Sequence, residues 1–253
     1  LDGIQIHGNI DIYAQTYNED SIIGAPLVPE KSGFNSFTNL IANKGNFSAG
    51  VRFESYLPPV QGFDERYGDQ KVGVPYRFVN FTKEGLDITV GNFYEQFGTG
   101  MILRAYEERA LGVDNAFDGV RVKYSPIDGL YLKAMAGNQR YYWEKSDGIV
   151  RAFDAEVQLN ELIAKFSESK LRVALGGSYV SKFQSTGIAS VVLPENVAAW
   201  SSRVQLNYKG FGFTGEYAYK VNDPSADNNY IYRPGQGLFL SGTYSRKGFG
   251  INI

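Results

Sequence analysis

The stretch IQIHGNIDIYAQT, residues 4–16, alternates apolar and polar side chains with a period of two. The two sets occupy alternate positions: Ile4, Ile6, Ile10, Ile12 and Ala14 against Gln5, His7, Asn9, Asp11 and Gln15. An α-helix, with its repeat of about 3.6 residues, would scatter both sets around its circumference. The stretch therefore predicts a β-strand with one apolar face and one polar face.

The same alternation recurs along the chain. It is found at 47–57, 86–95, 119–124, 152–160, 200–208 and 211–220. Segments 34–43 and 76–83 have large apolar residues on both faces, and we interpret them as strands too. The whole chain gives about 13 strands of about 8–12 residues. A tilted strand needs about 9–11 residues to cross a bilayer, whereas soluble strands average about 5–6.

The predicted connections fall into two kinds. Tight, glycine-containing turns lie at 43–46, 83–85, 125–129, 209–210 and 246–248, where glycine allows the positive φ of a hairpin turn. Longer polar segments lie at 18–33, 58–75, 96–116, 140–149, 182–197 and 221–236. The two kinds alternate, except that 160–169 lengthens one tight connection. This alternation predicts an antiparallel up-and-down sheet with short turns at one end and long loops at the other.

Composition excludes several classes of function. The formal charge of −2 and pI near 5.6 do not indicate a basic surface for nucleic acid, so we expect no nucleic-acid partner. The chain has no cysteine and a single histidine, His7, which excludes thiolate and multi-histidine metal sites. The FGTG at 97–100 lacks the lysine of a phosphate-binding loop. We therefore expect no catalytic residue, no metal and no cofactor.

Alternation alone does not say which face is inside. In a soluble sandwich the apolar face packs in the core, whereas in an outer-membrane barrel it faces lipid and the polar face lines a wet interior. No run approaches the roughly 18 apolar residues of a membrane helix. Strand length, loop asymmetry and aromatic residues near strand ends favour the membrane barrel. The sequence thus predicts an all-β, antiparallel up-and-down transmembrane barrel in a single domain, residues 1–253.

The chain as a whole resembles a porin-like outer-membrane barrel of Gram-negative bacteria in its mature form. The segment GNFYEQFGTGMILRAYEERALGVDN, 91–115, resembles uncharacterised outer-membrane barrels of Bacteroides–Flavobacterium-type bacteria and is more distantly similar to alginate-export barrels. This resemblance implies an outer-membrane location, contact with lipid or lipopolysaccharide, and contacts with other outer-membrane proteins or lipoproteins. It transfers no functional residue. Because such barrels have even strand numbers, an odd count ending at Ile253 predicts either a longer chain whose complete barrel has 14 or more strands, or a strand count that is off by one in 34–43 or 96–116.

Charged residues on the predicted polar faces are candidates to line the interior. They are Arg52, Glu54, Arg121, Lys123, Lys133, Arg151, Glu156, Arg172, Arg203 and Glu216. They would either select solutes by field and hydrogen bonding or neutralise one another as cross-strand pairs. Both signs are mixed, so no strong ion selectivity is expected.

The segment 97–115 is a candidate constriction loop. Its charges are Arg104, Glu107, Glu108, Arg109 and Asp114, and the first four are the candidate constriction residues. It would either fold into the interior and narrow it, or form an extracellular loop held by its own salt bridges. The loop aromatics Tyr141, Tyr142, Trp143, Tyr230 and Tyr232 would either stack on sugar rings or serve in loop packing.

Three functions fit these patterns. The first is an outer-membrane channel for passive passage or export of hydrophilic solutes. The second is a structural or assembly barrel within an outer-membrane complex, bound to lipoproteins or a secretion machine. The third is a soluble, carbohydrate-binding β-sandwich. Conductance separates the first two, and dependence on detergent separates both from the third.

Overall fold

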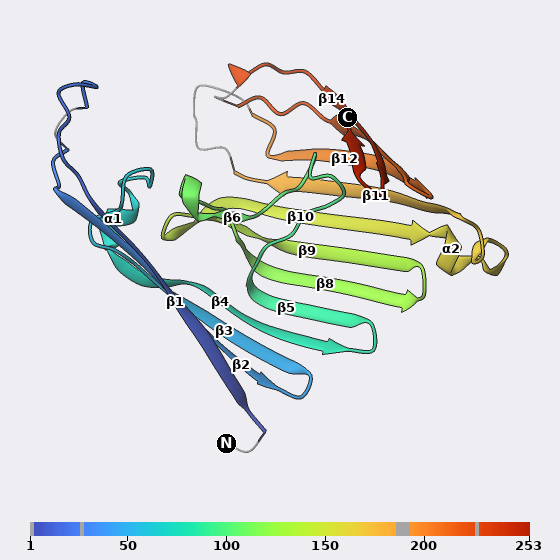
Figure 1. The fold of residues 1–253 in the computed structure, drawn as a ribbon, viewed down its shortest axis with the longest axis horizontal. Helices are drawn as coiled ribbons and strands as arrows, with labels where there is room; N and C mark the ends of the chain where they lie inside the picture. The colour runs from blue at the N-terminus through green and yellow to red at the C-terminus, as the bar shows by residue number, and fades with distance from the viewer. Residues whose placement is uncertain (1–2, 26–27, 186–192, 226–227) are drawn as a thin grey trace.

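The computed structural model describes residues 3–25, 28–185, 193–225 and 228–253. Thirteen strands form one antiparallel sheet in chain order (Figure 1). They are β1 (Gln5–Thr16), β2 (Ser32–Lys44), β3 (Phe47–Tyr56), β4 (Val72–Lys83), β5 (Leu86–Phe93), β8 (Phe117–Ile127), β9 (Leu130–Tyr141), β10 (Glu144–Gln158), β11 (Leu171–Phe183), β12 (Asn196–Tyr208), β13 (Phe211–Lys220), β14 (Gly235–Arg246) and β15 (Phe249–Asn252). The predicted all-β up-and-down architecture and strand number are confirmed, and segments 34–43 and 76–83 lie within β2 and β4.

The remaining elements are short. Strands β6 (Glu107–Glu108) and β7 (Val113–Asp114) pair with each other between β5 and β8. The helical turns are α1 (Tyr67–Gln70), η1 (Arg109–Leu111), α2 (Leu159–Leu162) and η2 (Ala164–Phe166). In the described part of the chain, no helix has the length and apolar character needed to cross a membrane.

The connections separate the two ends of the sheet. Glycine-containing turns join β2 to β3, β4 to β5, β8 to β9, β12 to β13 and β14 to β15, and they lie together along one edge in Figure 1. The opposite end carries longer connections, as predicted. The expected long loop at 140–149 is wrong, because only Tyr142 and Trp143 separate β9 from β10. These two strands extend past their neighbours, with a bulge between Lys145 and Ile149.

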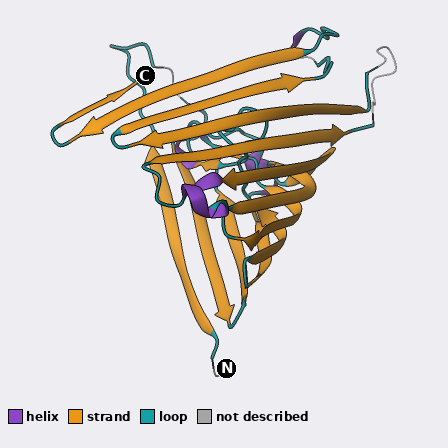
Figure 2. Ribbon diagram, turned by 90° about the vertical axis from the view of Figure 1, so that its right-hand side faces the viewer, coloured by secondary structure: helices purple, strands orange, loops and turns teal. Residues whose placement is uncertain are grey.

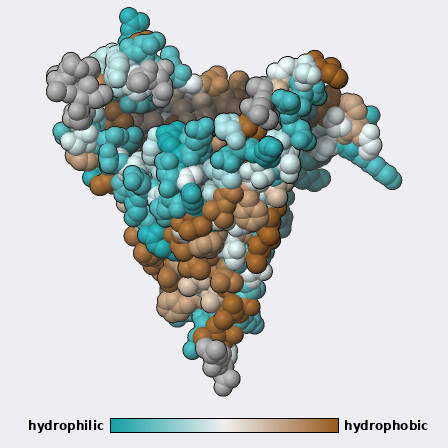
Figure 3. All heavy atoms as spheres, turned by 90° about the vertical axis from the view of Figure 1, so that its left-hand side faces the viewer, coloured by the Kyte–Doolittle hydropathy of each residue, from teal (hydrophilic) through white to brown (hydrophobic). Residues whose placement is uncertain are grey.

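The two faces of the sheet have inverted polarity. The outward face exposes apolar side chains, with Ile10 64% and Leu240 58% accessible. The inward face buries charged side chains, with Glu54 0% and Glu216 1% accessible. Figure 3 shows the apolar side chains gathered over the lower half of one outer surface and polar side chains above them. Soluble domains bury apolar side chains and leave charges exposed, so this sheet is organised in the opposite sense.

Glycine allows the wall to bend between β8 and β9. Gly119 and Gly137 are register partners on the inward face. A Cβ at Gly119 would lie 2.0 Å from the carbonyl oxygen of Ala136 and 2.5 Å from the Cα of Gly137. A side chain at Gly119 would therefore meet backbone atoms of β9, which glycine avoids. Such glycine positions allow a sheet to curve sharply rather than stay flat.

The curved sheet forms an open wall around its inward face. Strands β1 and β15 lie at its two ends in the strand order. Figure 2 shows the curved sheet with loops visible within the curve. Because all thirteen strands belong to one sheet, the described residues do not form the two packed sheets of a sandwich.

Candidate functional site

The connection between β5 and β8, residues 94–116, lies on the inward face and is called the inner loop below. It contains β6, η1 and β7. Two backbone hydrogen bonds within the loop fix the shape of its first part. The Ala105 N–H donates to the Glu95 oxygen, and the Phe97 N–H donates to the Leu103 oxygen. The loop thus has a defined structure of its own and contacts several strands of the wall.

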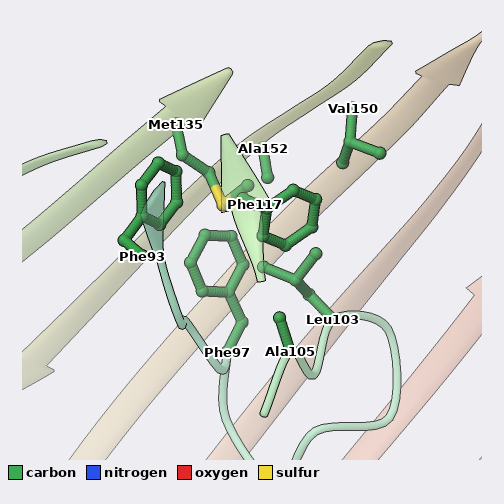
Figure 4. Packing of buried hydrophobic residues seen from close by; sticks show 8 residues of the cluster. All are labelled: Phe93, Phe97, Leu103, Ala105, Phe117, Met135, Val150 and Ala152. Carbon is green, nitrogen blue, oxygen red and sulfur yellow. The ribbon is translucent and has the colours of Figure 1, made fainter. Parts of the chain in front are cut away.

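An apolar cluster attaches the inner loop to the wall. The loop contributes Phe97, Leu103 and Ala105, which are at most 6% exposed. Figure 4 shows them against side chains of β5, β8, β9 and β10: Phe93, Phe117, Met135, Val150 and Ala152. Burying one phenylalanine or leucine contributes about 1.5–3 kcal/mol. The inner loop is therefore anchored to the inward face by hydrophobic packing.

A buried arginine cluster joins distant strands to the inner loop. Arg140 of β9 meets Glu54 of β3 through two contacts, Nη1–Oε1 at 3.0 Å and Nη2–Oε2 at 2.6 Å. Arg52 of β3 also pairs with Glu54, with Nε 2.7 Å from Oε1. Asp114 of the loop bridges the two arginines, lying 2.6 Å from Arg140 and contacting Arg52. Buried charges require such complete pairing, because leaving one unpaired is strongly destabilising.

Two more loop residues extend this cluster toward β1. Glu107 pairs with Arg52 at 3.0 Å and with Arg109 at 2.7 Å. Arg109 reaches Asp11 of β1 at 2.6 Å, and its guanidinium lies 4.3 Å from the Phe37 ring centroid. The loop therefore lies on the inward face, and its charges form ion pairs both within the loop and with the wall.

A second cluster surrounds Glu95 at the start of the inner loop. Its carboxylate lies 3.0 Å from Lys123, 2.9 Å from Lys133 and 3.6 Å from Arg121. The three cations come from neighbouring positions on β8 and β9, where Lys123 and Lys133 are register partners. Adjacent like charges destabilise a sheet, and the carboxylate offsets this repulsion. The strands and the loop are thus coupled electrostatically.

A third cluster lies on β10 to β13. Arg203 contacts Asp154 at 2.7 Å and Glu156 at 3.0 Å. Its register partner Glu216 accepts a hydrogen bond of 2.7 Å from the backbone N–H of Thr99 in the inner loop. Gly98 adopts φ +51°, and a Cβ there would lie 2.6 Å from Glu216 Oε2. An alanine at this position would strain the backbone and would require the Glu216 carboxylate to shift.

Four predicted residues lie outside these clusters. Arg151 departs from its expected inward placement: it is exposed and shares the outward face of β10 with Phe153, two positions away. Arg172, next to the tight end of β11, is exposed and forms no ion pair among the described residues. In the inner loop, Arg104 is exposed with its guanidinium 4.6 Å from the Tyr106 ring centroid, and Glu108 caps η1 by accepting from Ala110 N.

Sequence reasoning did not select several residues of the clusters. Arg140 lies in a predicted loop, and Asp154, Glu95 and Asp11 are not among the predicted site residues. Asp114 is predicted only as one of the charges of segment 97–115. Asp154 and Asp11 alternate with apolar neighbours, so their inward position follows from the sequence. The contacts of Arg140 and Asp114 do not follow from it, because their partners are far apart in the chain.

Together these side chains make a charged but largely paired interior. Arg52, Arg140 and Arg203 are each at most 6% exposed and bound to carboxylates. Paired charges that are fixed by hydrogen bonds can orient a polar solute, and they leave little net charge to select ions. Among the described residues, no group of three acidic or histidine side chains is placed to hold a metal ion.

Comparison with solved structures finds porins among the chains similar to this one. A BenF-like porin from Pseudomonas fluorescens Pf-5 shares 11% identity and a TM-score of 0.45, over 96% of this chain and 78% of the porin. OpdL of Pseudomonas aeruginosa shares 11% identity and a TM-score of 0.42, over 96% and 77%. A mutant of the Rh. blastica porin shares 10% identity and a TM-score of 0.32, over 98% and 92%.

Sequence comparison gives the family. A search of curated proteins found no match. The model of the Family of unknown function (DUF6029) matches residues 1–253. The chain therefore belongs to the Family of unknown function DUF6029.

Proposed function

We propose that this chain is a porin-like barrel of the bacterial outer membrane that passes hydrophilic solutes, with the inner loop narrowing its bore. The observation that carries the proposal is the inverted polarity of the sheet. Glu54, Asp154 and Glu216 are buried while Ile10 and Leu240 are more than half exposed. This arrangement is unfavourable in water and favourable when hydrocarbon covers the outward face.

The outward face also suggests its surroundings. Its apolar side chains would contact lipid or lipopolysaccharide, and long loops at one end match the extracellular loops of outer-membrane barrels. We propose no catalytic activity and no cofactor. Segment 91–115 relates the chain, in this proposal, to uncharacterised outer-membrane barrels of Bacteroides–Flavobacterium-type bacteria.

One observation favours a second candidate, a plugged barrel that serves as a structural or assembly subunit. Arg140 and Glu54 join β9 to β3 directly, and Asp114 of the inner loop fills the space beside them. These contacts occupy part of the interior rather than leaving it open. The exposed loops would then bind other outer-membrane proteins or lipoproteins.

Conductance of the full chain in planar bilayers tests these functions. Stepwise single-channel currents are expected for the channel. Silence from a protein whose electrophoretic mobility shifts on heating, the mark of a folded barrel, would favour the plugged subunit. A monodisperse sample in buffer without detergent would contradict both membrane functions and favour a soluble sugar-binding domain.

A further inference from the structure

A pocket at the long-loop end lies between α1 and the β9–β10 turn. It encloses about 500 Å³, within the range of about 300–1,000 Å³ typical of small-molecule sites. Tyr141, Tyr142 and Trp143 form one side, and α1 and its flanking residues form the other. None of the ion-pair clusters of the inward face contributes to it.

The pocket is held by a rigid frame. Trp143 Nε1 donates to the Tyr67 carbonyl oxygen at 2.8 Å, and Tyr142 OH donates to Asp64 Oδ2 at 3.1 Å. Arg66 meets Asp64 through Nε–Oδ1 at 2.8 Å and Nη2–Oδ2 at 2.7 Å. Behind them Tyr67 is 3% exposed and stacks on Tyr56 at 4.6 Å. A frame of this kind lowers the entropic cost of binding a ligand.

The turn that forms the pocket has an unusual sequence. Two-residue hairpin turns favour Asn-Gly or Asp-Gly, because their backbone has positive φ. Here the turn residues are Tyr142 and Trp143, and Tyr142 adopts φ +55°. A bulky residue in this region is strained. Tyr142 and Trp143 pack against the buried Tyr67 and Tyr56. Tyr141 is not part of this packing, and it leaves an aromatic ring exposed beside the turn.

Several acceptor groups around the pocket are available to a ligand. Tyr141 is 53% exposed, and its hydroxyl already accepts a hydrogen bond from Arg66 Nη1. Asp69 and Glu144 are exposed and, among the described residues, neither carboxylate makes a side-chain hydrogen bond or ion pair. Gln70 uses its amide nitrogen on the Val72 carbonyl oxygen, which leaves its amide oxygen facing no described donor. The pocket therefore offers an aromatic face surrounded by hydrogen-bond acceptors.

The charges of the pocket restrict the ligand. Arg66, which is paired with Asp64, already lies over the Tyr142 ring at 4.1 Å and the Tyr141 ring at 5.4 Å, so the cation–π position at these rings is occupied. An anion would meet Asp69 and Glu144. A neutral ligand with an apolar face and outward hydroxyl groups satisfies both conditions. We propose that this pocket binds a neutral sugar ring, with its C–H face on Tyr141 and its hydroxyls donating to Asp69 and Glu144.

The two tryptophans of the chain provide a local readout. Trp143 lies in the pocket, and Trp200 lies on the outward face of β12, 42% exposed. In a Trp200→Phe background, fluorescence of the full chain in detergent micelles reports on Trp143 alone. The probes are maltotriose, cellotriose and xylotriose, with tetramethylammonium and inorganic phosphate as charged comparisons. A saturable change with at least one trisaccharide, and none with the charged probes, is expected.

Matched variants then assign the binding to the pocket. Tyr141→Ala is expected to weaken trisaccharide binding roughly tenfold, whereas Tyr141→Phe retains it, since stacking needs only the ring. Tyr232→Ala, which removes a 62% exposed tyrosine from another loop, is expected to have no effect. Three results would each overturn the proposal. They are a response to tetramethylammonium or phosphate instead of sugars, the lack of a response to any trisaccharide, and an unchanged trisaccharide affinity in Tyr141→Ala. None of these results depends on whether the barrel conducts.

Discussion

Glu54 and Arg140 form a two-point ion pair of 3.0 and 2.6 Å, although β4, β5 and β8 lie between their strands in the sheet. The pair therefore connects opposite parts of the wall through the interior. Both side chains are at most 3% exposed. This contact limits the space inside the curve. The stability of the wall therefore depends in part on a buried ion pair.

Removing one member of this pair is expected to be costly. Arg140→Met leaves Glu54 buried with one partner fewer and should lower the free energy of unfolding by about 3–5 kcal/mol. The double variant Arg140→Met, Glu54→Leu should recover much of this loss, because paired apolar residues can replace a buried ion pair. Urea unfolding in detergent, followed by tryptophan fluorescence, measures both. A single variant as stable as the wild type would show that the pair is not buried in solution.

Gly98 is expected to be the sensitive glycine of the inner loop. Gly98→Ala should cost about 1–2 kcal/mol for the left-handed backbone and a further 1.5–3 kcal/mol, about the value of the charge-assisted Thr99–Glu216 hydrogen bond. Gly45→Ala is the matched control, because its φ of +57° is similar and no atom lies within 4 Å of the added Cβ. Urea unfolding gives the stability difference, and limited proteolysis tests loop release. Equal losses in both variants would contradict the contact with Glu216.

Glu95 is expected to balance three cations in the interior. Glu95→Gln leaves Arg121, Lys123 and Lys133 without their shared carboxylate, so the interior becomes more positive. If the protein conducts, the permeability ratio of anions to cations should rise roughly twofold or more. Reversal potentials under a salt gradient measure this ratio. The exposed Glu108→Gln serves as control, and an unchanged ratio in Glu95→Gln would place the conducting path away from this cluster.

The docking of α1 against the β9–β10 turn is expected to resist acid. Hydrogen bonds from the Arg66 side chain and backbone hold the pKa of Asp64 well below its ordinary value. A lowered folded-state pKa contributes stability above the ordinary aspartate pKa of about 3.9, and this contribution is lost only as pH falls through the lowered value. Arg66→Gln should therefore move the acid transition of Trp143 fluorescence to higher pH in the Trp200→Phe background. Asp69→Asn should leave the transition in place, and a shift in this control alone would contradict the assignment.

Adjacent residues of β1 test which face meets lipid. Ile10→Arg places a charge on the outward face and should cost about 2–4 kcal/mol if that face lies near the bilayer midplane. Asn9→Arg places the same charge on the inward face near Asp11 and should cost much less. Folding yield into lipid vesicles and urea unfolding there compare the two. Equal tolerance of both substitutions would contradict a lipid-facing outward surface.

Much of the sheet was predictable because side chains in a strand alternate with an exact period of two. The alternation of Ile10 with Asn9 and of Phe153 with Asp154 predicts both strands and their faces. The same rule, applied strictly, places Arg151 with Phe153 on the outward face. The prediction was wrong where the strand register changes. The bulge before Ile149 interrupts the alternation of side chains, so the short β9–β10 turn could not be predicted from it. The prediction also failed for Phe37, an inward aromatic that lies beneath Arg109, because contacts between the inner loop and the wall have no periodicity.

The lack of side chains at Gly119 and Gly137 limits how the sequences of related proteins can vary at these two positions. A single added methyl group at Gly119 would force β8 and β9 apart and change the radius of the wall, without altering any charge. Relatives that keep both positions free of side chains should therefore enclose similar interiors even where their loops diverge. Relatives that fill one of them should have a flatter wall and lose the meeting of β3 with β9.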